Sequence, residues 1–98
     1  MAFVLEITQE RPDTSTPWPE LDAAQEAQVQ ALRETHSVTG TVTVSEDELT
    51  RIMRTSASSA ADYTPYYQAA NEIWEAAGIV YQCSQANIQI AVNIVENT

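Results

Sequence analysis

Three stretches of the chain alternate between apolar and polar residues, the period of a strand with one buried face. They are residues 3–8, 38–44 and 88–94. The middle stretch is rich in β-branched residues, which favour strands. Residues 49–55 follow it across a polar turn at 45–48, so these two segments are predicted to form a β-hairpin. The apolar positions of the three alternating stretches are Phe3, Leu5 and Ile7; Val38, Val42 and Val44; and Ile88, Ile90, Val92 and Ile94.

Two other stretches have the composition or the spacing of helices. Residues 19–36 are rich in Ala, Gln and Glu, which favour helix by propensity. Residues 66–77 place apolar side chains three and four apart, and Gly78 follows, where a left-handed residue commonly ends a helix. Residues 56–62 offer several N-caps ahead of Pro65, which is tolerated in a first helical turn. The apolar stripe of the second helix is Tyr66, Ala69, Ala70, Ile73, Trp74 and Ala77.

The predicted order is therefore strand, helix, strand, strand, helix, strand. This βαββαβ order is that of the ferredoxin-like α+β fold, in which an antiparallel sheet carries both helices on one face. Residues 79–83 form either an extra short strand before the last one or an irregular segment that leads into it, and the strand is the favoured interpretation. Adjacent apolar residues, Ile52 with Met53 and Ile94 with Val95, predict that the uncovered sheet face is partly apolar. Such a face, with exposed sheet edges, would serve as an interface.

Composition narrows the set of partners. The 98 residues make a single domain, with 14 acidic residues against four arginines, no lysine and a net charge of −10. This surface repels phosphate backbones and acidic headgroups, so neither nucleic acid nor a membrane is expected as a partner. Basic or neutral proteins, or further copies of the chain, fit better; an acidic, lysine-free composition also suits a saline environment. The N-terminus lacks a basic start followed by a long apolar run, so no secretion signal is expected.

Residues that carry chemistry are few and isolated. His36 is the only histidine and has no accompanying partner set, so it is interpreted as a helix-end or surface residue. Cys83 is the only cysteine, which excludes an internal disulfide and favours a small buried side chain. Glu46, Asp47 and Glu48 do not have the spacing of a calcium loop and are interpreted as a solvated turn. No catalytic residue, metal or cofactor is expected.

Five residues are candidates for an interface. Trp18, flanked by prolines, either caps the core where the chain turns into the first helix or anchors a partner. Tyr63 and Tyr67 are expected to be exposed and to line an interface or a shallow pocket. Arg51 and Arg54 lie on opposite faces of one strand, and each is expected to pair with an acid within the fold or across a subunit contact.

Three short motifs carry a resemblance. The segments "RPDTSTPW" (11–18), "SEDELTR" (45–51) and "ADY" (61–63) resemble small βαββαβ proteins encoded by tailed phages. The shared features are an arginine-proline corner ending in proline and an aromatic, and a polar hairpin entering "LTR". The resemblance spans about the first two thirds of the chain. It implies a non-enzymatic virion component, such as a capsid-decorating, neck or tail subunit, that contacts copies of itself or other virion proteins and supplies no catalytic residues.

Two other functions fit parts of the sequence. A dimeric α/β-barrel-type enzyme or ligand-binding protein would enclose a pocket between two sheets and would use His36 with Tyr63 or Tyr67. An acidic mimic of DNA would use the net charge of −10 to occupy a basic site on a nucleic-acid enzyme.

Overall fold

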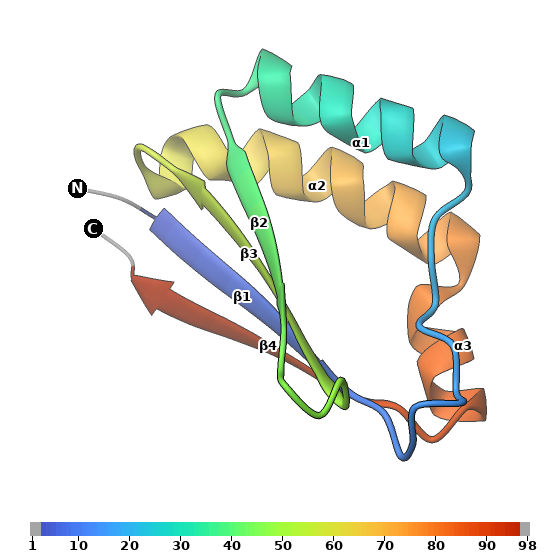
Figure 1. Cartoon of the computed structure of the whole chain (residues 1–98). Coiled ribbons are helices and arrows are strands. Elements are labelled where there is room, and N and C mark those ends of the chain that lie inside the picture. The colour runs from blue at the N-terminus through green and yellow to red at the C-terminus, as the bar shows by residue number, and fades with distance from the viewer. Residues whose placement is uncertain (1–2, 97–98) are drawn as a thin grey trace.

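Four strands and three helices follow one another in the computed structural model, which describes residues 3–96 (Figure 1). The strands form one antiparallel sheet in the order β2-β3-β1-β4, and the helices lie together on one side of it. The predicted ferredoxin-like α+β fold is confirmed. The elements are β1 (Phe3–Glu10), α1 (Ala23–Thr35), β2 (Thr39–Val44), β3 (Thr50–Ala57), α2 (Ala60–Ala77), α3 (Ile79–Gln85) and β4 (Gln89–Glu96).

The register of the central strands decides which side chains face the helices. Residues opposite each other in a ladder project from the same face of the sheet. The odd-numbered residues of β1 therefore share the helix side with the odd-numbered residues of β3. On β4 the same side carries Ile90, Val92 and Ile94, which pair with Gln9, Ile7 and Leu5. The helix-side pairs of β1 and β3 are Phe3–Ala57, Leu5–Thr55, Ile7–Met53 and Gln9–Arg51.

The bare face of the sheet is mostly polar but carries some apolar residues, as the adjacent apolar pairs predict. Thr39, Thr41 and Thr43 of β2 lie on this face. Among the paired positions that the structure describes, Val4 and Ile52 are the large apolar residues here, and both are partly buried. One residue of each adjacent apolar pair lies on the helix side instead: Met53 of the first pair and Ile94 of the second.

The core consists of two clusters joined by Leu21, which packs against both. The larger cluster lies between the sheet and helices α1 and α2. The smaller one lies around α3, where Ile79, Cys83 and Ile88 are buried. The buried members of the larger cluster are Phe3, Leu5, Val29, Val38, Ala57, Tyr63, Tyr66 and Ala70.

Both long helices begin elsewhere than the sequence predicts. Helix α1 starts four residues late, because Asp22 accepts from the backbone N–H of Gln25 and forms a capping box with it. Helix α2 starts earlier, at Ala60, after the N-cap Ser59. Pro65 is therefore not in the first turn: it occupies the second, where it leaves a helical carbonyl without its usual N–H donor.

Residues 79–83 are helical, so the prediction of an extra strand is wrong. Gly78 adopts the left-handed conformation that ends α2, and α3 begins at the next residue. In a strand, Tyr81 would share a face with Ile79 and Cys83 and would have to be buried. A helix instead brings Ile79 and Cys83 together at i and i+4 and leaves Tyr81 exposed. Burial of this pair outweighs the strand propensity of the segment.

The two glycines provide a matched test of the α2–α3 junction. Gly78 has φ of 69°, and a Cβ there would meet nothing within 4 Å, so a Gly78→Ala variant carries only the conformational cost of about 1 kcal/mol. Gly40 is in a strand, where an added Cβ would touch the flexible Arg33 side chain at 3.4 Å. We expect urea unfolding to show Gly78→Ala destabilised and Gly40→Ala unchanged or stabilised. Equal effects would contradict the assigned junction.

Candidate functional site

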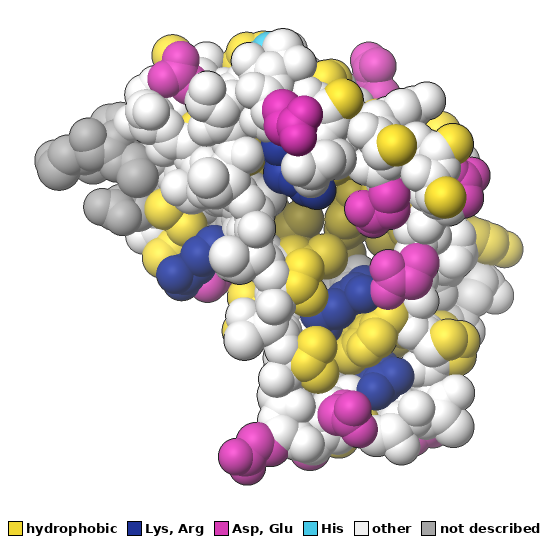
Figure 2. Space-filling view, turned by 45° about the horizontal axis from the view of Figure 1, so that its top comes forward, with side chains coloured by type: hydrophobic (Ala, Val, Ile, Leu, Met, Phe, Trp, Pro, Cys, Tyr) yellow, Lys and Arg dark blue, Asp and Glu magenta, His cyan; other side chains and the backbone are white. Residues whose placement is uncertain are grey.

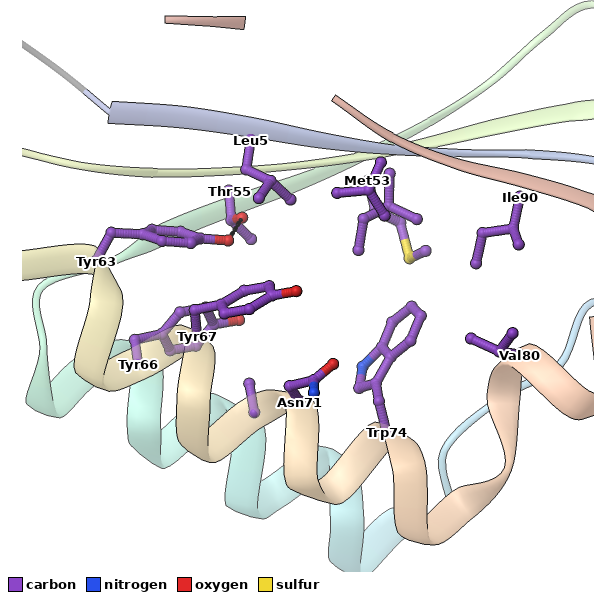
Figure 3. Close-up of a pocket in the computed structure, with 13 residues that line it drawn as sticks. Leu5, Met53, Thr55, Tyr63, Tyr66, Tyr67, Asn71, Trp74, Val80 and Ile90 are labelled. Carbon is purple, nitrogen blue, oxygen red and sulfur yellow. Dashed lines mark hydrogen bonds between the residues drawn. The ribbon is translucent and has the colours of Figure 1, made fainter. Parts of the chain in front are cut away.

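An apolar pocket lies between α2 and the sheet (Figure 3). We call it the α2 pocket; its volume is about 160 Å³. Aliphatic side chains of β1, β3 and β4 form one wall, and aromatic side chains of α2 form the other. The lining residues are Leu5, Ile7, Met53, Thr55, Tyr63, Tyr66, Tyr67, Ala70, Asn71, Trp74, Val80, Ile90 and Val92.

The pocket exists because α2 meets the sheet closely at its start and diverges from it toward its end. At its start, the ring of Tyr63 lies 4.6 Å from that of Phe3, centroid to centroid. At its other end, Trp74 packs against the cluster around α3 rather than directly on the central strands. Tyr67 and Asn71 lie between these contacts, at spacings of four from Tyr63 and from each other, so all three face the sheet from one side of the helix.

Polar atoms inside the pocket are few, and several are already paired. The hydroxyls of Tyr63 and Thr55 lie 2.6 Å apart. The Asn71 amide nitrogen donates to Glu75 at 3.1 Å. In Figure 3 the Asn71 oxygen and the Tyr67 hydroxyl reach toward the open part of the pocket. Burial raises the pKa of Tyr63 to about 12 and also raises the pKa of Tyr66, so these two phenols are neutral at physiological pH.

Exposed apolar side chains continue from the pocket along both sheet edges. On β4, Val92 is 58 % exposed and Ile94 is also exposed. On β2, at the opposite edge, Val42 is 63 % exposed and Val44 is exposed beside it. All four lie on the helix side, because they pair with helix-side residues of β1 and β3. The helices cover the centre of this face and leave its two margins open.

The segment 11–18 is a structural corner between β1 and α1. Asp13 accepts from the Ser15 hydroxyl and from both the backbone N–H and the hydroxyl of Thr16, which lowers the pKa of its carboxyl group. Trp18 packs against the α3 cluster and lies between two guanidinium groups. That of Arg11 is 4.6 Å from the indole centroid, and that of Arg51 is 4.9 Å away. In Figure 2, basic side chains lie among hydrophobic ones in a hollow of the surface.

Arg51 joins this corner to the sheet. Its side chain is buried, with the residue 8 % exposed. Nε and Nη2 donate to the side-chain oxygen of Gln9 at 2.9 and 2.6 Å, and Nη2 also donates to the carbonyl of Pro19 at 3.2 Å. Nη1 forms an ion pair with Glu20. Gln9 is fully buried and donates to the Cys83 sulfur at 3.7 Å. Gln9 is not among the residues singled out from the sequence, although it continues the helix-side parity of Phe3, Leu5 and Ile7.

The five interface candidates fall into three places. Tyr63 and Tyr67 meet in the α2 pocket, with ring centroids 6.1 Å apart. Tyr67 is 41 % exposed as expected, but Tyr63 is only 4 % exposed, because it packs on Phe3 in the core. Trp18 and Arg51 belong to the corner. Arg54 lies alone on the bare face, where it pairs with Glu6 of the neighbouring strand.

His36 and Cys83 do not join these groups. His36 follows α1 and borders a second, polar recess near Asp62 and Pro65, away from the tyrosines of the α2 pocket. Cys83 is fully buried, and burial raises the pKa of its thiol. Within residues 3–96, no three His, Cys, Asp or Glu side chains cluster as a metal site, and no helix has the length and apolarity to span a membrane.

Comparisons with known proteins give only distant structural likenesses. No protein family and no curated protein matches the chain. The designed protein Foldit4 aligns over the full length of both chains with 10 % identity and a TM-score of 0.49. A designed protein with a ferredoxin fold aligns over all of this chain and 88 % of its own, with 12 % identity and a TM-score of 0.44. Formyltetrahydrofolate deformylase from Burkholderia mallei is 17 % identical with a TM-score of 0.44, and the match covers 95 % of this chain but 28 % of the enzyme.

The two arginines of β3 allow a direct test of the corner. In Arg51→Ala the buried oxygen of Gln9 loses its donors and Trp18 loses a stacked cation, so we expect a loss of about 3 kcal/mol in the free energy of unfolding. Arg54→Ala removes an exposed ion pair and should lose about 1 kcal/mol or less. Urea denaturation of both variants measures the difference. Equal losses would show that the network does not stabilise the fold.

Burial of Tyr63 predicts unfolding at alkaline pH. The phenol has a pKa of about 12 in the folded chain and 10.0 as its ordinary value, so its contribution is complete below pH 10 and is lost as pH rises toward 12. The change amounts to about 3 kcal/mol over this interval. Denaturant titrations from pH 8 to about pH 12 should show a shallower decline in Tyr63→Phe, whereas Tyr81→Phe, at an exposed position, should follow the parent chain. Parallel declines in all three proteins would contradict this assignment.

Proposed function

We propose that the chain is a non-enzymatic assembly subunit of a phage particle, which binds copies of itself or other virion proteins through the edges of its sheet. The observation that carries the proposal is the state of the two edge strands. Both β2 and β4 have neighbours on one side only and carry exposed apolar side chains on the helix side. An unpaired row of backbone N–H and C=O groups beside such side chains is a template for another strand.

Of the features that usually block strand addition, β4 has one, a bulge near its end opposite Val4 and Leu5, and β2 has none. Proteins protect edges with lysines, prolines, strong bulges or charges that point inward. The segments 39–44 and 89–95 contain no charged residue and no proline. In a chain with a net charge of −10, these are also the places where two copies would repel each other least. The polar bare face, in contrast, offers little apolar area, so the edges rather than the face are the proposed contacts.

Two available edges on one subunit favour repeated assembly. Pairing of like edges closes a dimer about a two-fold axis, whereas pairing of β2 with the β4 strand of the next copy generates a ring or a filament. Either arrangement would extend the sheet without a change of fold. The assignment to a virion rests on the resemblance of the corner at 11–18 and the hairpin at 45–51 to small phage proteins.

Edge variants test the contacts. The double variants Val92→Lys/Ile94→Lys and Val42→Lys/Val44→Lys place charges on the exposed helix-side margins, and at least one should weaken association by about tenfold or more. Thr8→Lys/Thr50→Lys is the matched control, because it puts the same charges on the bare face of the central strands β1 and β3, away from both edges. Sedimentation or light scattering over a wide range of protein concentration gives the association constants. A control variant that weakens association as much as the others would exclude the helix-side margins.

The assignment to a virion requires a separate measurement. Quantitative mass spectrometry of purified particles should find the chain at a fixed copy number, in a multiple set by the particle's symmetry. A chain that is monomeric at every concentration and absent from particles would overturn the proposed function.

A further inference from the structure

We propose that the α2 pocket binds a small neutral aromatic molecule that carries a hydrogen-bond donor, a ligand of the phenol class. The proposal is independent of assembly through the sheet edges. It rests on the size of the pocket, on the absence of charge in its lining and on the Asn71 amide oxygen, an acceptor that lies beside the Tyr67 hydroxyl in the open part of the pocket.

The size and the lining select an aromatic ring. The volume of about 160 Å³ is close to that of the roughly 150 Å³ apolar cavity that accepts benzene. Met53 and the aliphatic residues of the sheet face one side of the space, and Tyr67 and Trp74 face the other (Figure 3). A flat ligand between these walls would gain both apolar burial and contact with aromatic rings. Tyr67 and Val80 are exposed at the margin, so the pocket opens to solvent.

The uncharged lining of the pocket favours a neutral ligand. None of its 13 lining residues is Asp, Glu, Lys, Arg or His. An anion would find no positive partner there and would be repelled by the net charge of −10. A cation would gain contact with the rings of Tyr67 and Trp74 but would lose its hydration against an aliphatic wall with no carboxylate in the lining.

The orientation of Asn71 selects a ligand that donates. Its amide group lies beside the carboxylate of Glu75, which accepts hydrogen bonds only, so the amide nitrogen must point toward Glu75. The amide oxygen is then the atom directed into the pocket, as Figure 3 shows. A phenolic hydroxyl seated between the two walls would donate to this oxygen. A hydrocarbon of the same shape would leave the oxygen without that bond.

The test is an NMR titration of the full chain with p-cresol as the probe. We expect saturable shifts of the Trp74 indole N–H and the Asn71 amide signals, with a Kd of about 1 mM or tighter. Toluene should bind about fivefold more weakly, because it cannot donate to Asn71. The anion 4-hydroxybenzoate and the cation tetramethylammonium should not bind. Absence of saturable shifts with p-cresol, or equal binding of either ion, would overturn the proposal.

Two variants locate the site. Ala70→Leu fills the pocket and should abolish binding of both p-cresol and toluene, whereas Ala76→Leu, on the exposed side of the same helix, should leave both unchanged. Asn71→Leu keeps the apolar lining but removes the acceptor, so the affinity for p-cresol should fall to the affinity for toluene. Because Asn71 is only partly buried, this variant gives an answer even where Ala70→Leu fails to fold. Retention of the preference for p-cresol in Asn71→Leu would overturn the assigned contact.

Discussion

The arrangement of the helices over the sheet depends on the buried guanidinium of Arg51. It binds Gln9 on the neighbouring strand, the carbonyl of Pro19 and the carboxylate of Glu20, and it stacks on Trp18. This one side chain thereby connects the sheet, the corner at 11–18 and, through Trp18, the α3 cluster. A charge in this position is stable only because its hydrogen-bonding groups are satisfied. The apolar contacts of Trp18 with the α3 cluster then determine how the end of α2 is supported.

The same support explains why an open pocket remains beneath α2. Helix α3 lies between the end of α2 and the sheet, so α2 packs close to the strands at its start and is held away from them toward its end. If α2 lay closer to the sheet, its aromatic side chains would pack on the strands. At the observed separation they form one wall of the α2 pocket. With only three helices, the sheet margins at β2 and β4 also stay uncovered. The pocket and the exposed edges thus both result from the helix layer: it is too narrow to cover the edge strands, and α2 is too far from the sheet to fill the space between them.

Much of the fold follows from local patterns. Alternation over 3–8, 38–44 and 88–94 predicts the strands. In each strand the alternating apolar side chains lie on the helix side of the sheet and the side chains between them lie on the bare face. Parity alone puts the threonines of β2, and Gln89 and Asn93 of β4, on the face opposite the apolar positions, and the register agrees. The apolar spacing predicts helix α2, and Gly78 predicts its end. Gly78 adopts the left-handed conformation expected of a glycine at that position. From these elements the βαββαβ order follows, since short connections allow few other sheets.

By itself, then, the sequence determined the strand faces, the order of the elements and the corner at 11–18, because backbone geometry and side-chain parity act over a few residues. Only the tertiary structure decided that 79–83 is helical, that Tyr63 is buried and that Gln9 accepts from Arg51. Each of these outcomes depends on a partner distant in sequence: the Trp18 side chain, the Phe3 ring and the guanidinium of another strand. Local propensities are worth a few tenths of a kcal/mol per residue, and burial of one large side chain exceeds them.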